Sequence, residues 1–283
     1  MAIFTNQATL RYNNITRNSN IATGEIVQSL TLTKEAVSNE YFPSDDISYA
    51  LSVVNTGATQ LQNLTLVDNL GAYQLGTNTL YPLTYTDGSL KYYINGVLQP
   101  TPTITASPAL TITGINLPAG ANAMFIYEVT ANEFAPIALG SSITNTAALQ
   151  SSATTPPITA SETVTVRAVS DLTISKSVSP SVVNENGLLT YTFVIQNTGN
   201  AATSGSATVS DTFLPRLDNV TVTYNGEAWS EGVNYTYDQT TGEFATLDGQ
   251  ISVDGAVFVQ DPITGEITST PGVAVITVTG NVI

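Results

Sequence analysis

The sequence predicts an all-β protein made of two tandem β-sandwiches, and three observations lead to this prediction. The chain repeats itself internally, its segments alternate apolar and polar residues between turn residues, and no stretch carries a sustained helical period with caps. Thr, Val, Ile and Tyr, which favour a half-buried pleated surface, are abundant. With 42% hydrophobic residues among 283, the chain has enough apolar material for two packed cores.

The internal repeat is visible in five pairs of segments. LTLTKEAV near the start recurs as LTISKSVS, and a strand-like segment ending in Asn-Thr-Gly follows each copy. The later pairs are LTLVDNL with ATVSDTF, YYINGVLQP with VTYNGEAWS, and FIYEVTAN with AVITVTGN. About seven short alternating strands in each copy predict an immunoglobulin-like sandwich. We therefore divide the chain into an amino-terminal hairpin and linker, domain 1 and domain 2, at residues 1–30, 31–169 and 170–283.

The two copies end differently. Domain 1 closes with two strand-like segments around a Ser/Thr/Pro-rich turn, at 141–169, whereas domain 2 stops after its counterpart of FIYEVTAN. The matching closing segments stand at the front of the chain instead. FTNQATL (4–10) resembles ITNTAAL (143–149), and IATGEIV (21–27) resembles ITASETV (158–164). A sandwich without its last strands leaves unpaired backbone groups and an uncovered core.

Two arrangements repair domain 2. The amino-terminal hairpin enters domain 2 of the next molecule, or it folds back onto domain 2 of its own chain. The hairpin runs directly into domain 1, as the domain 1 hairpin runs into domain 2, so each hairpin is expected to bridge consecutive domains. The first arrangement therefore predicts a head-to-tail homopolymer, because a heterologous contact does not close on itself. The second predicts a monomeric, adhesin-like binding module.

Composition excludes several classes of function. A net charge of −15, from 22 acidic and 7 basic residues, disfavours binding to nucleic acid and docking to anionic membranes. The chain has no His and no Cys, so the common zinc sites and the His-dependent nucleophilic sites are absent. No apolar run is long enough to insert across a bilayer. We expect no catalytic residue, no metal and no cofactor, and a protein that binds itself.

The sequence resembles a family of bacterial surface repeats known as domain of unknown function eleven. The resemblance rests on four motifs. The first is Lys-x-Val at Lys176, which is one residue longer at Lys34, and the second is the Tyr-containing strand that ends in Asn-Thr-Gly. The third is Val-x-Asp at Asp211, and the fourth is Thr-Asn-x-Ala at Asn145. It covers both repeats, and the opening Phe-Thr-Asn-Gln-Ala is similar to small two-repeat proteins of clostridia-like spore formers. The resemblance implies an extracellular structural protein of the cell or spore surface, without catalytic residues. The start of the sequence lacks the pattern of a secretion signal, so the export route stays open.

The strand-exchange hypothesis assigns residues to both sides of the joint. The expected donor residues are Ile3, Phe4, Asn6, Ala8 and Leu10. The expected acceptor residues, placed near the open edge of domain 2, are Ile276, Val278 and Val282. Apolar side chains and backbone hydrogen bonds are expected to hold the joint.

Lysine is scarce, and two of the three lysines stand at equivalent positions of the repeat. A buried, neutral lysine beside a protonated carboxyl can attack an asparagine amide and form an isopeptide bond. The candidate set in domain 1 is Lys34, Asp68 and Asn145. The set in domain 2 is Lys176, Asp211 and, from a neighbouring molecule, Asn6. The alternative is that the lysines are surface strand residues and that the Asp and Asn residues stabilise turns.

Two further patterns have structural explanations that compete with functional ones. Acidic groups such as Asp45–Asp46 and Asp261–Glu266 lack the spacing of a calcium loop and are expected to be solvated turn residues. Tyrosines at alternating strand positions, among them Tyr92, Tyr127 and Tyr235, are expected to fill the sandwiches more often than to form a sugar-binding platform.

Overall fold

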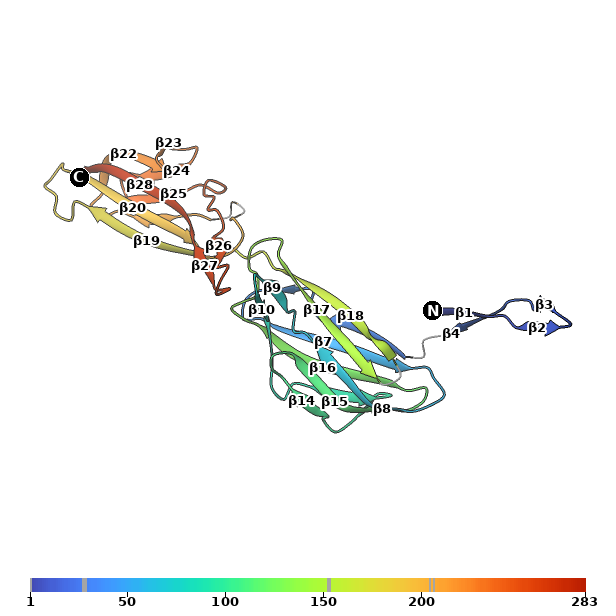
Figure 1. Cartoon of the computed structure of the whole chain (residues 1–283). Helices are drawn as coiled ribbons and strands as arrows, with labels where there is room; N and C mark the ends of the chain where they lie inside the picture. The colour runs from blue at the N-terminus through green and yellow to red at the C-terminus, as the bar shows by residue number, and fades with distance from the viewer. Residues whose placement is uncertain (1, 27–29, 152–153, 204, 206) are drawn as a thin grey trace.

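The computed structural model describes residues 2–26, 30–151, 154–203, 205 and 207–283. All regular structure in these ranges is β, which confirms the predicted fold class. Two sandwiches and an amino-terminal hairpin follow one another along an elongated chain (Figure 1). Within the described residues, one buried core draws on residues from Leu30 to Val166 and a second on residues from Leu189 to Val278.

Domain 1 is a sandwich of two six-stranded sheets. The first sheet has the order β13-β12-β16-β7-β5, with β11 also paired to β16. Its strands are β5 (Leu30–Ala36), β7 (Asp46–Asn55), β11 (Leu83–Tyr85), β12 (Lys91–Ile94), β13 (Val97–Leu98) and β16 (Asn122–Ala131). The second sheet has the order β14-β15-β8-β17-β18-β6. Its strands are β6 (Glu40–Tyr41), β8 (Leu61–Asp68), β14 (Thr103–Thr105), β15 (Leu110–Leu117), β17 (Ser142–Ser151) and β18 (Thr154–Val166).

The core of domain 1 follows from alternation along its strands. In β7 every second residue is buried, from Ile47 to Asn55, and β16 shows the same period. Tyr92 stacks on Phe125 with ring centroids 4.7 Å apart, so tyrosine side chains fill this core. A short pair, β9 (Tyr73–Leu75) with β10 (Asn78–Leu80), stands outside the two sheets.

Domain 2 repeats the first sheet but has a reduced second sheet. The first sheet has the order β19-β20-β28-β22-β23, and the second has the order β21-β25-β24. The strands are β19 (Leu172–Ser179), β20 (Leu188–Asn197), β21 (Ser210–Thr212), β22 (Leu217–Tyr224), β23 (Glu227–Trp229), β24 (Tyr235–Asp238), β25 (Glu243–Thr246) and β28 (Gly272–Val282). Among the described residues, no strand of domain 2 takes the places that β17 and β18 hold in domain 1.

The amino-terminal segment forms a hairpin of two successive strand pairs. Its outer pair is β1 (Ala2–Asn6) with β4 (Ala22–Ile26), and its inner pair is β2 (Thr9–Tyr12) with β3 (Ile15–Asn18). In Figure 1 this hairpin extends from the end of domain 1 that lies opposite domain 2. Every side chain described from Phe4 to Thr23 is exposed. The hairpin is therefore a strand pair without a core of its own, which is marginal in water.

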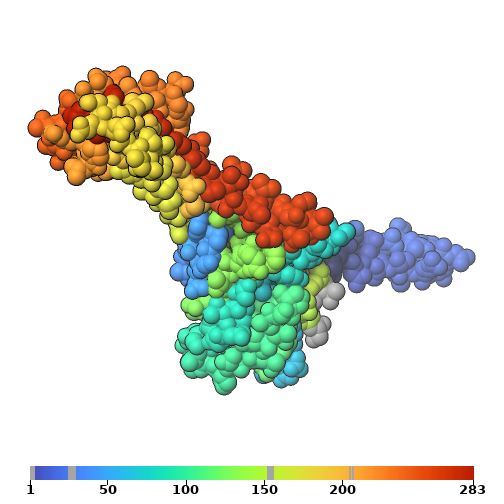
Figure 2. All heavy atoms as spheres, turned by 90° about the vertical axis from the view of Figure 1, so that its left-hand side faces the viewer, coloured from blue at the N-terminus to red at the C-terminus, as the bar shows by residue number. Residues whose placement is uncertain are grey.

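A second hairpin fixes the junction between the two domains. It consists of β26 (Val257–Gln260) and β27 (Ile267–Thr270), and Figure 2 shows it in orange-red against domain 1. Gln260 Nε2 donates to the hydroxyl of Tyr73 at 2.6 Å, and Asn78 Nδ2 donates to the carbonyl oxygen of Ile263 at 2.9 Å. The buried amide of Asn200 donates to the carbonyl oxygen of Arg167 at 3.0 Å. These contacts hold domain 2 away from the amino-terminal hairpin.

The separate cores generate a first prediction. Phe213→Ala removes a ring that stacks on Tyr191 at 4.6 Å between centroids and contacts Phe244 at 5.6 Å. Loss of such a buried aromatic ring costs about 3–5 kcal/mol. Denaturant unfolding followed by domain-specific probes should show this loss in domain 2 while the domain 1 transition stays in place. Phe125→Ala is the matched control for domain 1, and an equal loss in both domains for either variant contradicts the division into two cores.

Candidate functional sites

The flank of domain 1 formed by β5 is covered. Strand β18 lies against β5, where the two sheets meet, and its Ile158 and Ala160 pack on the core. Leu30 and Leu32 on β5 are consequently 2% and 8% exposed. The side chain of Lys34, next on the same face, is fully buried. The closing hairpin of domain 1 thus seals both the apolar residues and the lysine from water.

The equivalent flank of domain 2 is uncovered. Strand β19 pairs with β20 on one side, and every residue of β19 is exposed. Leu172 and Ile174, the counterparts of Leu30 and Leu32, are 36% and 56% exposed. The same sequence pattern therefore gives a sealed flank in one domain and an apolar exposed flank in the other. Apolar surface of this kind marks a binding face.

The second sheet of domain 2 also ends at an open edge. In domain 1, β8 pairs with β15 on one side and with β17 on the other, where Asp68 stands opposite Ala147. In domain 2, β21 pairs with β25 alone and is the edge strand of its sheet. The position that β17 fills beside β8 is thus unfilled beside β21. An open edge offers backbone donors and acceptors to an added strand.

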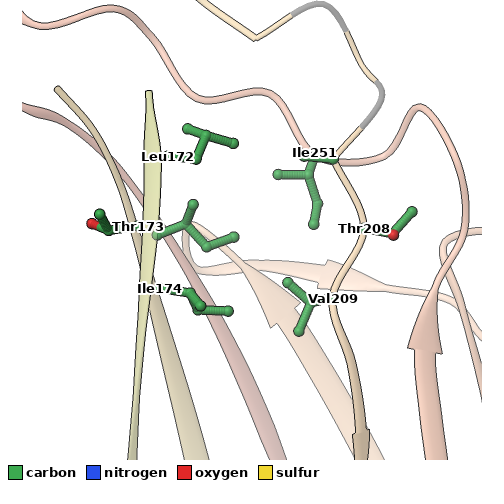
Figure 3. Close-up of a pocket in the computed structure, with 8 residues that line it drawn as sticks. Leu172, Thr173, Ile174, Thr208, Val209 and Ile251 are labelled. Atoms are coloured by element: carbon green, nitrogen blue, oxygen red, sulfur yellow. The ribbon is translucent and has the colours of Figure 1, made fainter. Parts of the chain in front are cut away.

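A groove runs between β19 and the segment that leads into β21. Figure 3 shows Leu172, Thr173 and Ile174 on one wall and Thr208, Val209 and Ile251 on the other. Ile195 and Ala207 complete the lining, which is mainly apolar. The groove lies where the closing hairpin of domain 1 would be if domain 2 had one. A β-strand with apolar side chains fits it by shape and chemistry.

The predicted acceptor residues need correction. Strand β28 pairs with β20 on one side and β22 on the other, so Ile276, Val278 and Val282 lie in a central strand. Ile276 and Val278 are fully buried. The prediction placed them at an open edge because β28 is the last strand in sequence, but the last strand is not the edge strand here. The open edge belongs to β21, and the uncovered flank belongs to β19.

The predicted donor residues lie in the exposed hairpin. Phe4 and Leu10 are each more than half exposed, and Asn6 and Ala8 are exposed between them. The backbone of Ile3 pairs with Glu25 in the hairpin, and its side chain lies outside the described part of the structure. The structure brings none of these residues into contact with domain 2 of the same chain. Phe4 covers Gly24 across the hairpin, so a methyl group at Gly24 would collide with its ring.

The structure brings the three predicted cross-linking positions of domain 1 into one buried cluster. Lys34 comes from β5, Asp68 from the end of β8, and Asn145 from β17 in the facing sheet. Lys34 Nζ forms an ion pair with Asp68 Oδ2 and donates to the hydroxyl of Tyr127 at 2.8 Å. The hydroxyl of Tyr127 donates in turn to the same oxygen of Asp68. Lys34 Nζ also lies 4.3 Å from the ring centroid of Tyr49.

Burial sets the electrostatics of this cluster. Desolvation lowers the pKa of Lys34 and outweighs the opposing effect of Asp68. Desolvation, followed by the charge of Asp68, raises the pKa of Tyr127 well above its ordinary value, so its hydroxyl stays protonated and can donate. A lowered pKa of Lys34 favours the neutral amine. A neutral amine is the nucleophilic form.

The amide of Asn145 is hydrogen-bonded through its oxygen but not through its nitrogen. Its Oδ1 accepts a hydrogen bond from the backbone N–H of Gly71 at 3.2 Å, which polarises the carbonyl group. Its Nδ2 is buried and has no hydrogen-bond partner. A buried amide nitrogen without a partner is costly and calls for an explanation. Expulsion of this nitrogen as ammonia provides one.

The arrangement is compatible with a balanced acyl transfer. In such a transfer Lys34 Nζ would attack Cγ of Asn145, the Nζ–Cγ bond would form, and the Cγ–Nδ2 bond would break. Asp68 would receive a proton from Nζ and pass one to the departing nitrogen, which would leave as ammonia. The product would be a neutral amide that joins β5 to β17 across the sandwich. It would also remove a buried charge pair and a buried unpaired amide.

Sequence reasoning missed two members of this cluster, Tyr127 and Gly71. Tyr127 is at an inward-facing position of its strand. The alternation of the strand predicted that its side chain is in the core but did not predict its polar partners. Gly71 has φ of +70° and would press a side chain against Ile143, so the turn after β8 requires glycine. A glycine three residues after the aspartate at the end of a strand was the available signal.

Other sequence expectations can be placed briefly. Tyr92, Tyr127 and Tyr235 are buried and fill the cores, so they form no exposed platform. No three residues among His, Cys, Asp and Glu gather into a metal-binding group in the described part of the chain. Nor does the described part contain a helix with the length and hydropathy needed to cross a membrane.

Comparison with known proteins gives distant structural likenesses only. No protein-family model matches the sequence, and no curated protein does. Among solved structures, the chain is similar to BcpA, the major pilin subunit of Bacillus cereus. The two sequences are 12% identical, the match covers 96% of this chain and 73% of that chain, and the TM-score is 0.39. It is also similar to the carboxyl-terminal fragment of the major pilin GBS80 of Streptococcus agalactiae, with 16% identity, coverages of 87% and 91%, and a TM-score of 0.37.

A collagen-binding domain from a Staphylococcus aureus adhesin covers about half of the chain. Its identity is 12%, the coverages are 49% of this chain and 99% of that chain, and the TM-score is 0.31. Likenesses with TM-scores this low carry no argument about function. The functional proposals below are therefore drawn from the residues of this chain.

The buried cluster predicts a cross-link inside domain 1. Intact-mass measurement should give a protein lighter than its sequence by one ammonia, and peptide mapping should join Lys34 to Asn145. Asn145→Ala and Asp68→Asn should restore the full mass, the first by removing the electrophile and the second by removing the proton relay. Lys91→Arg, an exposed lysine outside the cluster, is the matched control and should leave the loss unchanged. A wild-type protein of full sequence mass overturns the assignment.

Proposed function

We propose that this chain is the structural subunit of an extracellular fibre that grows head to tail by exchange of its amino-terminal hairpin. The observation that carries the proposal is the contrast between two equivalent flanks. In domain 1 the β5 flank is covered by β18, and in domain 2 the β19 flank is open. The segment resembling β17 and β18 lies exposed at the front of the same chain. Domain 2 of one subunit receives it from the next.

The placement of the two sites favours joining different molecules. Figure 1 places the hairpin at one end of the chain and domain 2 at the other, with domain 1 between them. The contacts of β26–β27 with Tyr73 and Asn78 fix domain 2 at its end. A donor at one end and an acceptor at the other make a heterologous contact that repeats as a filament.

The equivalence with domain 1 gives the register of the joint. Asp68 stands opposite Ala147 and Leu66 opposite Leu149 in domain 1. Transfer to the equivalent positions sets Ala8 of the donor opposite Asp211 and Leu10 opposite Val209. Leu10 then enters the groove lined by Leu172, Ile174 and Ile251. The donor strand extends the β21 edge, and the returning strand covers β19.

Burial of apolar surface supplies much of the affinity. Phe4 and Leu10 on the donor, and Leu172 and Ile174 on the acceptor, are exposed before assembly. Full burial of each such side chain contributes about 1.5–3 kcal/mol, and the new strand adds backbone hydrogen bonds. Part of this gain offsets the entropy of association. The net result is a stable joint between subunits.

The free hairpin must change its register to enter the acceptor. In the free hairpin Phe4 pairs with Gly24, whereas its counterpart Ile143 pairs with Val164, the counterpart of Val27. Val27 lies outside the described residues. The two registers differ by three residues. Because this number is odd, the side chains of one strand point to the opposite face of the hairpin in the second register. The free register therefore cannot present both strands to the core of domain 2, and insertion includes re-pairing.

The remaining assignments rest on this fibre role. A structural subunit with a strongly negative charge stays soluble until a specific contact joins it to another copy. Membership of the surface repeat family named domain of unknown function eleven, and a place on the cell or spore surface, are part of the proposal. The pilin-like and adhesin-like fold is compatible with both. No enzymatic activity is proposed.

The fibre proposal predicts filaments from the purified protein. Negative-stain microscopy should show filaments with the wild-type chain and none after removal of residues 1–26. The shortened chain keeps its open acceptor, so adding it to wild-type protein at low ratio should shorten filaments by blocking growth. Phe4→Asp and Leu10→Asp should abolish assembly, because they place a charge in an apolar groove. Thr5→Asp is the matched control, since its counterpart Thr144 faces solvent in the closed domain.

Closure within one molecule would be established by two results together. The protein would be a monodisperse monomer at high concentration, and the groove would be protected from solvent in the full chain but not after removal of residues 1–26. That outcome contradicts the fibre and supports the adhesin-like alternative. Filaments that persist without residues 1–26 contradict strand exchange.

The change of register predicts that a lock on the free hairpin blocks assembly. Thr5 stands opposite Thr23 in the free register, and the chain has no native cysteine. A Thr5→Cys/Thr23→Cys variant should form a disulfide that holds this register, remain monomeric when oxidised, and polymerise once reduced. Thr5→Cys alone is the control and should assemble under both conditions. Assembly of the oxidised double variant at the wild-type rate contradicts the re-pairing step.

A further inference from the structure

We propose that Lys176 of one subunit and Asn6 of the next form an isopeptide bond, so that the fibre becomes covalently continuous from subunit to subunit. This inference rests on the strand exchange proposed above and adds a chemical step to it. The step requires no enzyme and no cofactor. Three features of the molecule support it. Domain 2 contains a lysine and an aspartate placed as in domain 1, the donor hairpin contains an asparagine equivalent to Asn145, and assembly would bury the site.

Domain 2 contains two of the three groups found in the cluster of domain 1. Lys176 Nζ forms an ion pair with Asp211 Oδ2, as Lys34 does with Asp68. Lys176 Nζ lies 4.5 Å from the ring centroid of Tyr191, which is the counterpart of Tyr49. It also lies 5.4 Å from the ring centroid of Phe213. The amine of Lys176 therefore already lies over aromatic rings and beside a carboxyl group.

The third group is missing from domain 2 and present in the donor. In domain 1 the amide comes from Asn145, two residues before the alanine that stands opposite Asp68. In the donor, Asn6 stands two residues before Ala8, and Ala8 is the residue set opposite Asp211. Asn6 is exposed in the free hairpin. Insertion in the register of domain 1 delivers its amide to Lys176.

Assembly also supplies the burial that the chemistry needs. In domain 1 the side chains of Lys34 and Asp68 are 0% and 2% exposed, whereas those of Lys176 and Asp211 are 39% and 20% exposed. The open flank accounts for much of this difference, because β18 lies against β5 in domain 1 and no described strand lies against β19 in this way. A returning donor strand over β19 removes this exposure. Desolvation then favours the neutral amine, as it does at Lys34.

The reaction is balanced and releases ammonia. Nζ of Lys176 attacks Cγ of Asn6, forms the new C–N bond and displaces Nδ2. Asp211 takes the proton from Nζ and gives one to the departing nitrogen. The backbone N–H of Leu214, at the position of Gly71, is the equivalent donor to the amide oxygen. Ile276 replaces Tyr127, so Asp211 is the polar partner of the amine here, and we expect slower bond formation than in domain 1.

The test uses the full chain after assembly. Boiling in detergent should leave a ladder of covalent oligomers, and peptide mapping should identify a Lys176 peptide joined to an Asn6 peptide with the loss of one ammonia. Lys176→Arg and Asn6→Ala should each abolish the ladder. Both residues are exposed before assembly, so neither change should unfold the subunit. Gln7→Ala and Lys91→Arg are matched controls that should keep the ladder.

The outcomes separate this inference from the fibre proposal. Wild-type filaments that fall entirely to monomers of unaltered mass in detergent overturn the cross-link and leave strand exchange standing. A ladder that survives in Lys176→Arg overturns the assignment of the lysine. Absence of filaments and of covalent oligomers overturns both the cross-link and the fibre.

Discussion

A β-sandwich is stabilised by covering its apolar core, and an uncovered flank leaves apolar side chains in water beside unpaired backbone groups. Domain 1 covers its core with its own closing hairpin, β17–β18. Domain 2 has the same first sheet and the same inward pattern, yet its β19 flank and β21 edge are open. The open flank of domain 2 and the exposed amino-terminal hairpin are complementary in sequence pattern. The proposed assembly would satisfy both.

The same constraint governs the chemistry of the lysines. Lys34 and Lys176 each pair with an equivalent aspartate and lie over an equivalent tyrosine ring, but only the side chain of Lys34 is sealed from water. Burial lowers the pKa of Lys34, and it also leaves the amide of Asn145 without a partner for its nitrogen. In domain 1 the cover is part of the chain and the site is complete after folding. In the fibre that we propose, the cover of domain 2 comes from another copy, which would couple reactivity to polymerisation.

Much of this could be predicted from the sequence because the chain contains its own comparison. The repeat, with alternation at positions such as 47–55 and 189–197, was enough to predict two sandwiches, an amino-terminal hairpin and the grouping of Lys34, Asp68 and Asn145. The exposure of that hairpin was not predicted, because the repeat pattern indicated a hairpin docked in a domain 2. The position of the open edge was not predictable, because strand order in a sheet depends on long-range pairing. Val278 lies in a central strand although it belongs to the last segment of the chain. Tyr127 and Gly71 were missed because their roles depend on contacts across the sandwich.

A high-resolution cryo-electron microscopy map of the assembled material would test most directly whether the amino-terminal hairpin of one subunit completes domain 2 of the next. The account predicts that the flank between β19 and β21 contains residues 2–26 of a neighbouring subunit, with Leu10 beside Val209 and Ala8 opposite Asp211. A map in which that flank is empty, or is filled by the hairpin of the same chain, contradicts the account.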